Sequence, residues 1–222
     1  GLIATANHDM TGSFWDGDPT DEGAAPDNTV YQTSPANGYR YSQIMRLLDR
    51  PEPHTAESLN QIIHDREVII ARRLLPMILS MLTIDDLSAY GALVYESLID
   101  WSYECPAGVS LVHIDESTPV ESEAERRASA ACLSFHTLYG QLSIEVFSDE
   151  LSEIPGFPKA DYEALARLLA RPEVLIRDVS YWDDTSTEEE EDMSHTITAG
   201  FNRAGRVMAE EFGDDPAQWL WG

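Results

Sequence analysis

Lysine is almost absent from this chain of 222 residues, in which Lys159 is the single example. The other 13 of the 14 basic residues are arginines, and 40 acidic residues bring the formal net charge to -26. A surface this acidic repels phosphate backbones, so the composition argues against a nucleic-acid-binding protein. We attribute the acidic excess to solubility, with an acidic surface for a specific partner as the alternative.

Long apolar runs are also missing. No run approaches the roughly 18 residues that a membrane-spanning helix requires, so no membrane span is predicted. The chain nevertheless is 43% hydrophobic and has 5 Trp, 9 Tyr and 6 Phe, which is enough for a folded core. It begins at Gly1 without a start Met or a signal peptide, and we expect these 222 residues to be a piece of a larger protein.

Cysteine is scarce as well, and the two present lack the spacing of a metal site. Cys105 follows a Glu and precedes Pro-Ala-Gly, whereas Cys132 lies in an Ala-rich helical segment. A disulfide and a pair of buried free thiols both remain open at this point.

Helical periodicity dominates the chain after residue 38. The fold class predicted is mainly α, with one short strand at the N-terminus that ends at Asn7. We expect two regions, 1–38 (the strand and a long acidic loop) and 39–222 (a helical domain). Seven helices are expected. The first four lie at 41–48, from the capping residue Thr55 through Ile63, at about 66–82 with a kink or break at Pro76, and over Leu87–Trp101 with Asp85 or Asp86 as cap. The other three run from Glu123 to about Phe147, over Tyr162–Leu169, and onward from a capping box formed by Thr187 and Glu190.

Two polar residues are candidates for catalysis. Asn7 ends the predicted strand, and its side-chain amide offers donors that a developing oxyanion can accept; the alternative is a turn cap. Arg40 begins a helix between Tyr39 and Tyr41, where a guanidinium can orient a carboxylate or hold a carbonyl. The alternative for Arg40 is a surface salt bridge.

The acidic loop is a candidate calcium site, because clustered carboxylates among glycines can bind Ca²⁺. The spacing does not fit an EF-hand loop, and a solvated loop is the alternative. The acidic residues concerned are Asp9, Asp16, Asp18, Asp21 and Glu22.

The six histidines are scattered, and none pairs with a Ser or Cys in a way that suggests a catalytic triad. His136 lies within the long helix expected from Glu123 to Phe147. We predict that it packs there rather than acting as a base.

Seven segments, taken in order, resemble the penicillin acylase family of N-terminal-nucleophile amidohydrolases. The resemblance spans nearly the whole chain. The matching segments are Ile3–Asp9 (similar to TANN-D), Gly38–Leu48 (GYR…RI…LL), Thr55–Asp65, Arg72–Pro76 (LLP), Leu98–Trp101 (L-x-x-W), Trp182–Asp184 (F-D-D) and Trp219–Gly222 (W-x-W-G).

The resemblance implies an N-terminal Ser nucleophile whose own α-amino group acts as base and which forms an acyl-enzyme with an amide substrate. Asn7 then matches the oxyanion Asn, Arg40 matches the active-site Arg, and Asp18 matches a structural calcium ligand, with Asp16 and Asp21 as rivals for that role. The fold implied is the helical middle region of an αββα β subunit, whose partners are the remaining α and β segments of the parent enzyme. The family also implies a periplasmic or secreted location.

The sequence also departs from the family pattern. Gly1 is not a nucleophile, so we expect the Ser to lie outside these 222 residues and the chain alone to be inactive. His8 replaces the second Asn of the first motif, and Ser102-Tyr103 replaces an Asp-Gly pair. The acyl group of the substrate is left open. Two other functions compete, a non-catalytic acidic helical interaction domain and a calcium-binding module.

Overall fold

The computed structural model describes residues 38–108, 122–151, 162–173, 175–176, 179–184 and 187–221. The predicted N-terminal strand and the acidic loop lie outside these described residues. The chain divides into two compact units, Gly1–Asp65 and Arg66–Gly222, each of which is described by itself.

The first unit contains helices α1 (Tyr39–Leu48) and α2 (Ala56–Ile63). The predicted Thr55 cap of α2 is confirmed. Thr55 Oγ1 accepts the backbone N–H of Ser58 at 3.1 Å, and Ser58 Oγ accepts that of Thr55 at 2.9 Å. This reciprocal pair is a capping box, which satisfies two donors that a helix start leaves without an intrahelical partner.

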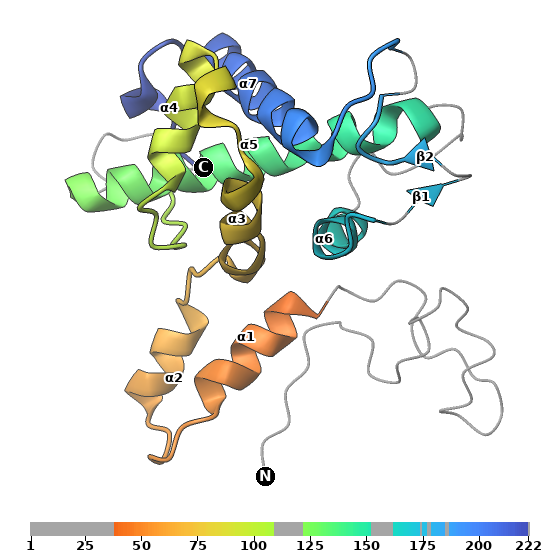
Figure 1. The fold of residues 1–222 in the computed structure, drawn as a ribbon. Helices are drawn as coiled ribbons and strands as arrows, with labels where there is room; N and C mark the ends of the chain where they lie inside the picture. The colour runs from red at the N-terminus through yellow and green to blue at the C-terminus, as the bar shows by residue number, and fades with distance from the viewer. Residues whose placement is uncertain are drawn as a thin grey trace, which may run out of the picture. The chain divides into compact units, whose positions relative to one another are not determined.

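The second unit is also mainly helical, which confirms the predicted class (Figure 1). A two-residue antiparallel pair, in which Leu175 faces Ser180 and Ile176 faces Val179, was not predicted. The elements are α3 (Ile69–Met81), the 3₁₀ turn η1 (Ile84–Asp86), α4 (Ala89–Leu98), α5 (Glu123–Leu151), α6 (Tyr162–Ala170), β1 (Leu175–Ile176), β2 (Val179–Ser180), α7 (Met193–Phe212) and the 3₁₀ turn η2 (Pro216–Gln218).

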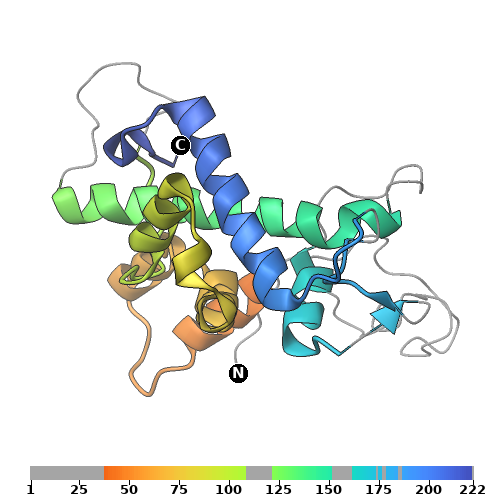
Figure 2. The ribbon, with the colours of Figure 1, turned by 45° about the horizontal axis from the view of Figure 1, so that its top comes forward.

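Helix α5 forms the centre of this second unit, and α7 crosses it (Figure 2). The steps of three and four between apolar residues predict one buried face on each helix. That face is Ala128, Ala131, Phe135, Leu138 and Leu142 on α5 and Met193, Ile197, Phe201, Ala204 and Met208 on α7. Ala128 and Met193 are partly buried against the core, and the other residues are buried in it. The apolar stripes of two helices thus pack into one core, which also receives side chains from α3, α4 and α6.

Two predicted helix starts in this unit are wrong. Helix α3 begins at Ile69 rather than near Arg66, because the preceding residues pair with an extended segment: Val68 N donates to Tyr103 O at 2.8 Å and Cys105 N to Arg66 O at 3.0 Å. Pro76 lies inside α3. Helix α4 is capped by Ser88, whose Oγ accepts the N–H of Gly91 at 3.1 Å, while Asp85 and Asp86 belong to η1.

The predicted capping box at Thr187 and Glu190 is also wrong. Helix α7 begins at Met193, and Asp192 caps it by accepting the backbone N–H of His195 at 2.9 Å. Thr187 instead donates to the Glu191 carboxylate at 2.9 Å. The run of glutamates therefore precedes the helix, and its charges do not occupy the first turn, where the helix dipole would stabilise them.

Two glycines let α4 and α7 approach closely. A Cβ built on Gly205 would lie 2.4 Å from the backbone carbonyl of Tyr90, and one built on Gly91 would lie 2.3 Å from Asn202 Oδ1. Backbone atoms cannot rotate away as a side-chain end can, so the contact at Gly205 excludes any larger residue unless the helices separate.

Gly205→Ala is therefore expected to lower the free energy of unfolding by about 1–3 kcal/mol through overpacking. Urea unfolding followed by circular dichroism measures it. Gly140 is the matched control, because a Cβ at this position would meet no described atom within 4 Å outside its own helix backbone, and Gly140→Ala should gain about 0.4–1 kcal/mol. An equal change in both variants would show that close approach of α4 does not constrain Gly205.

Candidate functional site

Arg40 is the one predicted catalytic residue that lies within the described residues. It is the second residue of α1, and it is exposed. Gly38 precedes the helix with φ 78°, a left-handed conformation that glycine adopts without a steric penalty. The glycine of the Gly-Tyr-Arg motif therefore fixes the start of α1, and this start places Arg40 in the first turn of the helix.

The other side chains of this first unit hold the two helices together. Gln43 is buried on α1, and its Nε2 donates to Asp65 Oδ2 at 2.8 Å beyond the end of α2. Its Oε1 accepts from Arg46 Nε at 2.9 Å. Asn7 and Asp18 lie outside the described residues, so the predicted grouping of Asn7 with Arg40, and calcium at Asp18, stay predictions.

A groove of about 700 Å³ lies in the second unit between α4, the start of α5 and η2. Its charged lining groups include Glu96 near the end of α4, Asp100 just after that helix, and Arg126 and Arg127 from α5. Ser97 also lines it from the last turn of α4, and its Oγ donates to Val94 O at 2.7 Å. No His or Cys is among the described residues that line the groove.

A Ser, a His and an Asp come close in sequence at the start of α7, but they serve the helix end. Asp192 caps the helix, and Ser194 Oγ shares a hydrogen bond of 2.7 Å with Thr83 Oγ1. Thr198 Oγ1, one turn on, accepts from Thr83 N at 3.3 Å. These contacts join α7 to the segment before α4, and they do not form a charge-relay arrangement.

The three tryptophans of the later motifs are structural. Each is buried, and each donates its indole N–H to a backbone carbonyl of a nearby loop. Trp101 donates to Glu104 O at 2.8 Å, Trp182 to Pro172 O at 3.2 Å and Trp219 to Gly213 O at 2.9 Å. The motifs therefore mark places where a loop is held against the core.

The Trp-Asp-Asp motif also organises a loop. Asp183 Oδ1 accepts the backbone N–H of Glu191 at 3.0 Å, and the Glu191 carboxylate accepts the N–H of Asp184 at 3.1 Å. These bonds cross the loop that leads into α7. The Asp183 carboxylate is thereby engaged with backbone in the part of the chain that the structure describes.

Tyr103 has a backbone conformation that favours glycine, with φ 66°. In the resemblance described from the sequence, Tyr103 replaces the Gly of an Asp-Gly pair. A left-handed non-glycine residue costs roughly 1–2 kcal/mol. The ring offsets part of this cost, because it packs 5.6 Å from Trp101 and lies 5.6 Å below the Arg72 guanidinium.

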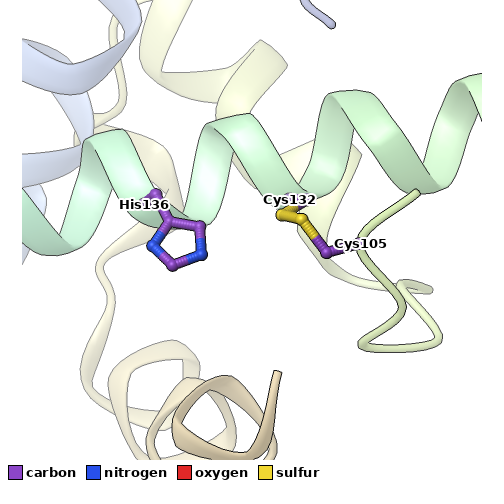
Figure 3. Close-up of side chains that lie close together, drawn as sticks. All are labelled: Cys105, Cys132 and His136. Atoms are coloured by element: carbon purple, nitrogen blue, oxygen red, sulfur yellow. A yellow bond between two sulfur atoms is a disulfide. The ribbon is translucent and has the colours of Figure 1, made fainter. Parts of the chain in front are cut away.

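Cys105 and Cys132 form a disulfide, with Cα atoms 5.2 Å apart, which decides between the two possibilities that the sequence left open. The bond joins the loop after α4 to α5. His136 lies on the same side of α5, four residues after Cys132 (Figure 3). Its ring stacks on Trp221 at 4.6 Å and meets Phe135 edge-on at 5.6 Å, so the prediction of a packing role is supported.

Burial lowers the pKa of His136 below its ordinary 6.5. The His136 ring of the unfolded chain therefore binds a proton more readily than that of the folded chain. The stability that the neutral ring contributes is fully present above about pH 6.5, and it is lost as the pH falls through the lower pKa of the folded state. We expect the free energy of unfolding to fall more between about pH 7.5 and pH 5.5 in the parent than in a His136→Phe variant.

Urea unfolding of both proteins at the two pH values measures this difference. The carboxylates and the other histidines contribute equally to both proteins, so they cancel in the comparison. An identical pH dependence in parent and variant would contradict a buried, neutral His136.

Sequence reasoning left the disulfide undecided, and it missed the roles of the tryptophan N–H groups. The sequence signal for the disulfide was the presence of two cysteines. The sequence signal for the indole hydrogen bonds was the position of each Trp at a helix end or beside a turn. Neither signal says which carbonyl or which sulfur comes close, because these pairs depend on how the helices pack.

The family model described as penicillin amidase matches residues 1–222. A search of curated proteins found no match, and a search of solved structures likewise found none. The match covers the whole chain and confirms the resemblance carried by the seven motifs, so this chain belongs to the penicillin amidase family.

Proposed function

We propose that this chain is part of an amidohydrolase that cleaves a non-peptide amide bond through an acyl-enzyme. The nucleophile is an N-terminal Ser that lies outside these 222 residues. Its Oγ attacks the amide carbonyl, its α-amino group passes the proton to the leaving amine as the C–N bond breaks, and water then hydrolyses the ester. The observation that supports this proposal is the family match over residues 1–222.

Asn7 is the oxyanion donor in this proposal. Its side-chain N–H would hydrogen-bond to the carbonyl oxygen as negative charge develops on it, an interaction that is stronger in the transition state than in the bound substrate. The support is positional: Asn7 occupies the Asn position of the first family motif, and Gly38-Tyr39-Arg40 follows in the expected order.

Arg40 is a positioning residue in the same proposal. It lies exposed in the first turn of α1, at a helix start that Gly38 defines. A guanidinium can hold a carboxylate or carbonyl by two parallel hydrogen bonds, which a lysine ammonium cannot reproduce. The second unit would serve as a scaffold, since its motif tryptophans hold loops against the core.

A disulfide forms and persists in oxidising compartments, so the Cys105–Cys132 bond favours an extracytoplasmic location. We propose the periplasm or the exterior of the cell as that location. Among the described residues, no helix has the length and apolar character to cross a membrane.

The test is Asn7→Ala in the complete processed enzyme that contains this chain. We expect kcat for a chromogenic amide to fall by roughly 100- to 1,000-fold with little change in KM, because the donor acts mainly in the transition state. Asn60→Ala is the matched control, since Asn60 is an exposed amide on α2. Arg40→Lys should lower kcat/KM by about tenfold, because it keeps the charge but loses the planar fork.

An unchanged kcat in Asn7→Ala would refute the oxyanion role. The 222-residue chain alone is expected to release no chromophore. Turnover by that chain, lost on Asn7→Ala, would show instead that the nucleophile lies within it.

A further inference from the structure

The acidic excess of this chain is greater than its basic residues can neutralise. Even if each of the 14 basic residues paired with a different carboxylate, 26 carboxylates would have no basic partner. Some basic residues are also shared, since Arg66 lies 3.7 Å from Glu104 and 3.6 Å from Glu125. Most of the negative charge must therefore be balanced by cations from the solvent.

The acidic residues occur in runs, of which Glu188–Asp192 is the longest in the second unit. Glu188, Glu189 and Glu190 are all exposed. Successive Cα atoms are about 3.8 Å apart, which is well inside the Debye length of about 10 Å at 0.1 M salt. Neighbouring carboxylates of a run therefore repel one another in dilute buffer, whereas a Debye length of about 3 Å at 1 M removes most of this repulsion.

The end of α7 carries negative charge where a helix tolerates it least. Glu210 and Glu211 are exposed in its last turn, which has no basic residue. A helix C-terminus bears a partial negative charge, so each of these carboxylates destabilises α7 at low ionic strength, and salt screens the effect. Arg206 precedes Glu210 by four residues, which is the less favourable order for an ion pair on a helix.

Two more carboxylates follow the same helix end. Asp214 Oδ1 accepts the Tyr90 hydroxyl at 2.7 Å, and this hydrogen bond, together with the negative charge of Asp214, raises the pKa of Tyr90 above its ordinary 10.0. Asp215 Oδ1 accepts the backbone N–H of Ala217 at 3.0 Å. We call Glu210, Glu211, Asp214 and Asp215 the α7-end cluster. Within the described part of the chain, none of the four forms an ion pair with a basic residue.

We propose that this chain is adapted to concentrated monovalent salt, and that Na⁺ or K⁺ at about molar concentration stabilises its fold by screening the surface carboxylates. The cations form a diffuse layer over the acidic surface, so the two ions are equivalent in this role. The α7-end cluster is the place where screening removes both repulsion between carboxylates and their unfavourable interaction with a helix end. This inference is independent of the proposed amidohydrolase activity.

The first test is thermal unfolding of the full 222-residue chain at about 0.1 M and about 2 M NaCl, with KCl in a parallel series. Tryptophan fluorescence is the signal, because four of the five tryptophans lie in the second unit. We expect Tm to rise by at least about 10 °C between the two concentrations, and by the same amount in KCl.

The second test neutralises part of the α7-end cluster with Glu210→Gln and Glu211→Gln together. Glutamine keeps the shape and the helix propensity of glutamate, so only the charge changes. We expect the double variant to melt about 2–6 °C above the parent at about 0.1 M NaCl, and to melt with the parent at about 2 M. A general stabilising effect of salt on apolar burial acts equally on both proteins and cancels in this difference.

Glu123→Gln is the matched control, because it removes the same charge from the opposite end of a helix. Glu123 is exposed in the first turn of α5, where the helix dipole favours an anion. We expect this variant to melt about 1–4 °C below the parent at about 0.1 M NaCl, and to melt with the parent at about 2 M. The sign of the change thus separates an effect of position on the helix from the mere loss of one negative charge.

Three results would overturn the proposal. The first is a Tm that does not rise with salt, or a chain that is unfolded at every salt concentration. The second is a rise that is equally large in the Glu210→Gln and Glu211→Gln double variant, since salt would then act without screening these carboxylates. The third is a full rise in millimolar CaCl₂ at low NaCl, which would indicate a divalent-cation site in place of a diffuse layer.

Discussion

Replacing Trp219 with Ala is expected to lower the free energy of unfolding by about 3–5 kcal/mol, the usual cost of removing a buried large aromatic side chain. Trp219 is 0% exposed, and it follows η2, where the chain returns to the core formed around α5. The cost has two parts. The first is the cavity left in the core, and the second is the Gly213 carbonyl, which loses the indole donor at 2.9 Å.

Urea unfolding of the purified chain, followed by far-ultraviolet circular dichroism, measures this loss. Trp219→Phe separates the two parts, since it keeps most of the apolar volume but removes the N–H, and a loss of about 1–3 kcal/mol is expected. Trp221→Ala is the matched control, because Trp221 is only partly buried and stacks on His136 at one face. A loss at Trp221 equal to that at Trp219 would contradict the importance of complete burial.

Removing the disulfide with Cys105→Ala and Cys132→Ala together is expected to cost about 3–4 kcal/mol. The bond closes a loop between residues 27 positions apart, and the loss corresponds to the entropy that a cross-link of this length removes from the unfolded chain. Alanine is chosen because Cys132 is fully buried, where a serine hydroxyl would need a partner.

Unfolding of the double variant is compared with that of the oxidised parent and of the parent in reductant under metal-free conditions. The last two proteins should differ by nearly the same amount as parent and variant. A difference below about 1 kcal/mol would show that the unfolded chain is already compact around these cysteines, so that the cross-link removes little entropy.

The long helices could be predicted because their apolar positions repeat every three or four residues. Ala131, Phe135 and Leu138 on α5 are all buried, as their spacing indicates. The capping residues were harder to predict. Thr187 and Glu190 match a capping box by residue type, yet Asp192 caps α7 and Thr187 contacts Glu191. Because five consecutive acidic residues follow Thr187, several positions in this segment match a helix-capping pattern by residue type.

Tyr103 shows a second limit of local reasoning. A tyrosine after Trp101 and Ser102 predicts no special turn, yet its φ is 66°. The conformation is imposed by the neighbouring segment, since Val68 N donates to the Tyr103 carbonyl at 2.8 Å. The candidate catalytic residues had a different basis. Asn7 and Arg40 follow from motif order, while the residues taken singly favoured a turn cap for Asn7 and a surface salt bridge for Arg40.

By itself the sequence determined the helical class, the faces that enter the core and the penicillin amidase family, because periodicity and motif order are properties of the linear chain. Only the tertiary structure decided that Cys105 bonds Cys132, that His136 lies beside them and which carbonyl each motif tryptophan binds. Those pairs join residues that become neighbours only after α4, α5 and α7 have packed. Their distances are therefore set by the arrangement of the helices and not by the spacing of residues along the chain.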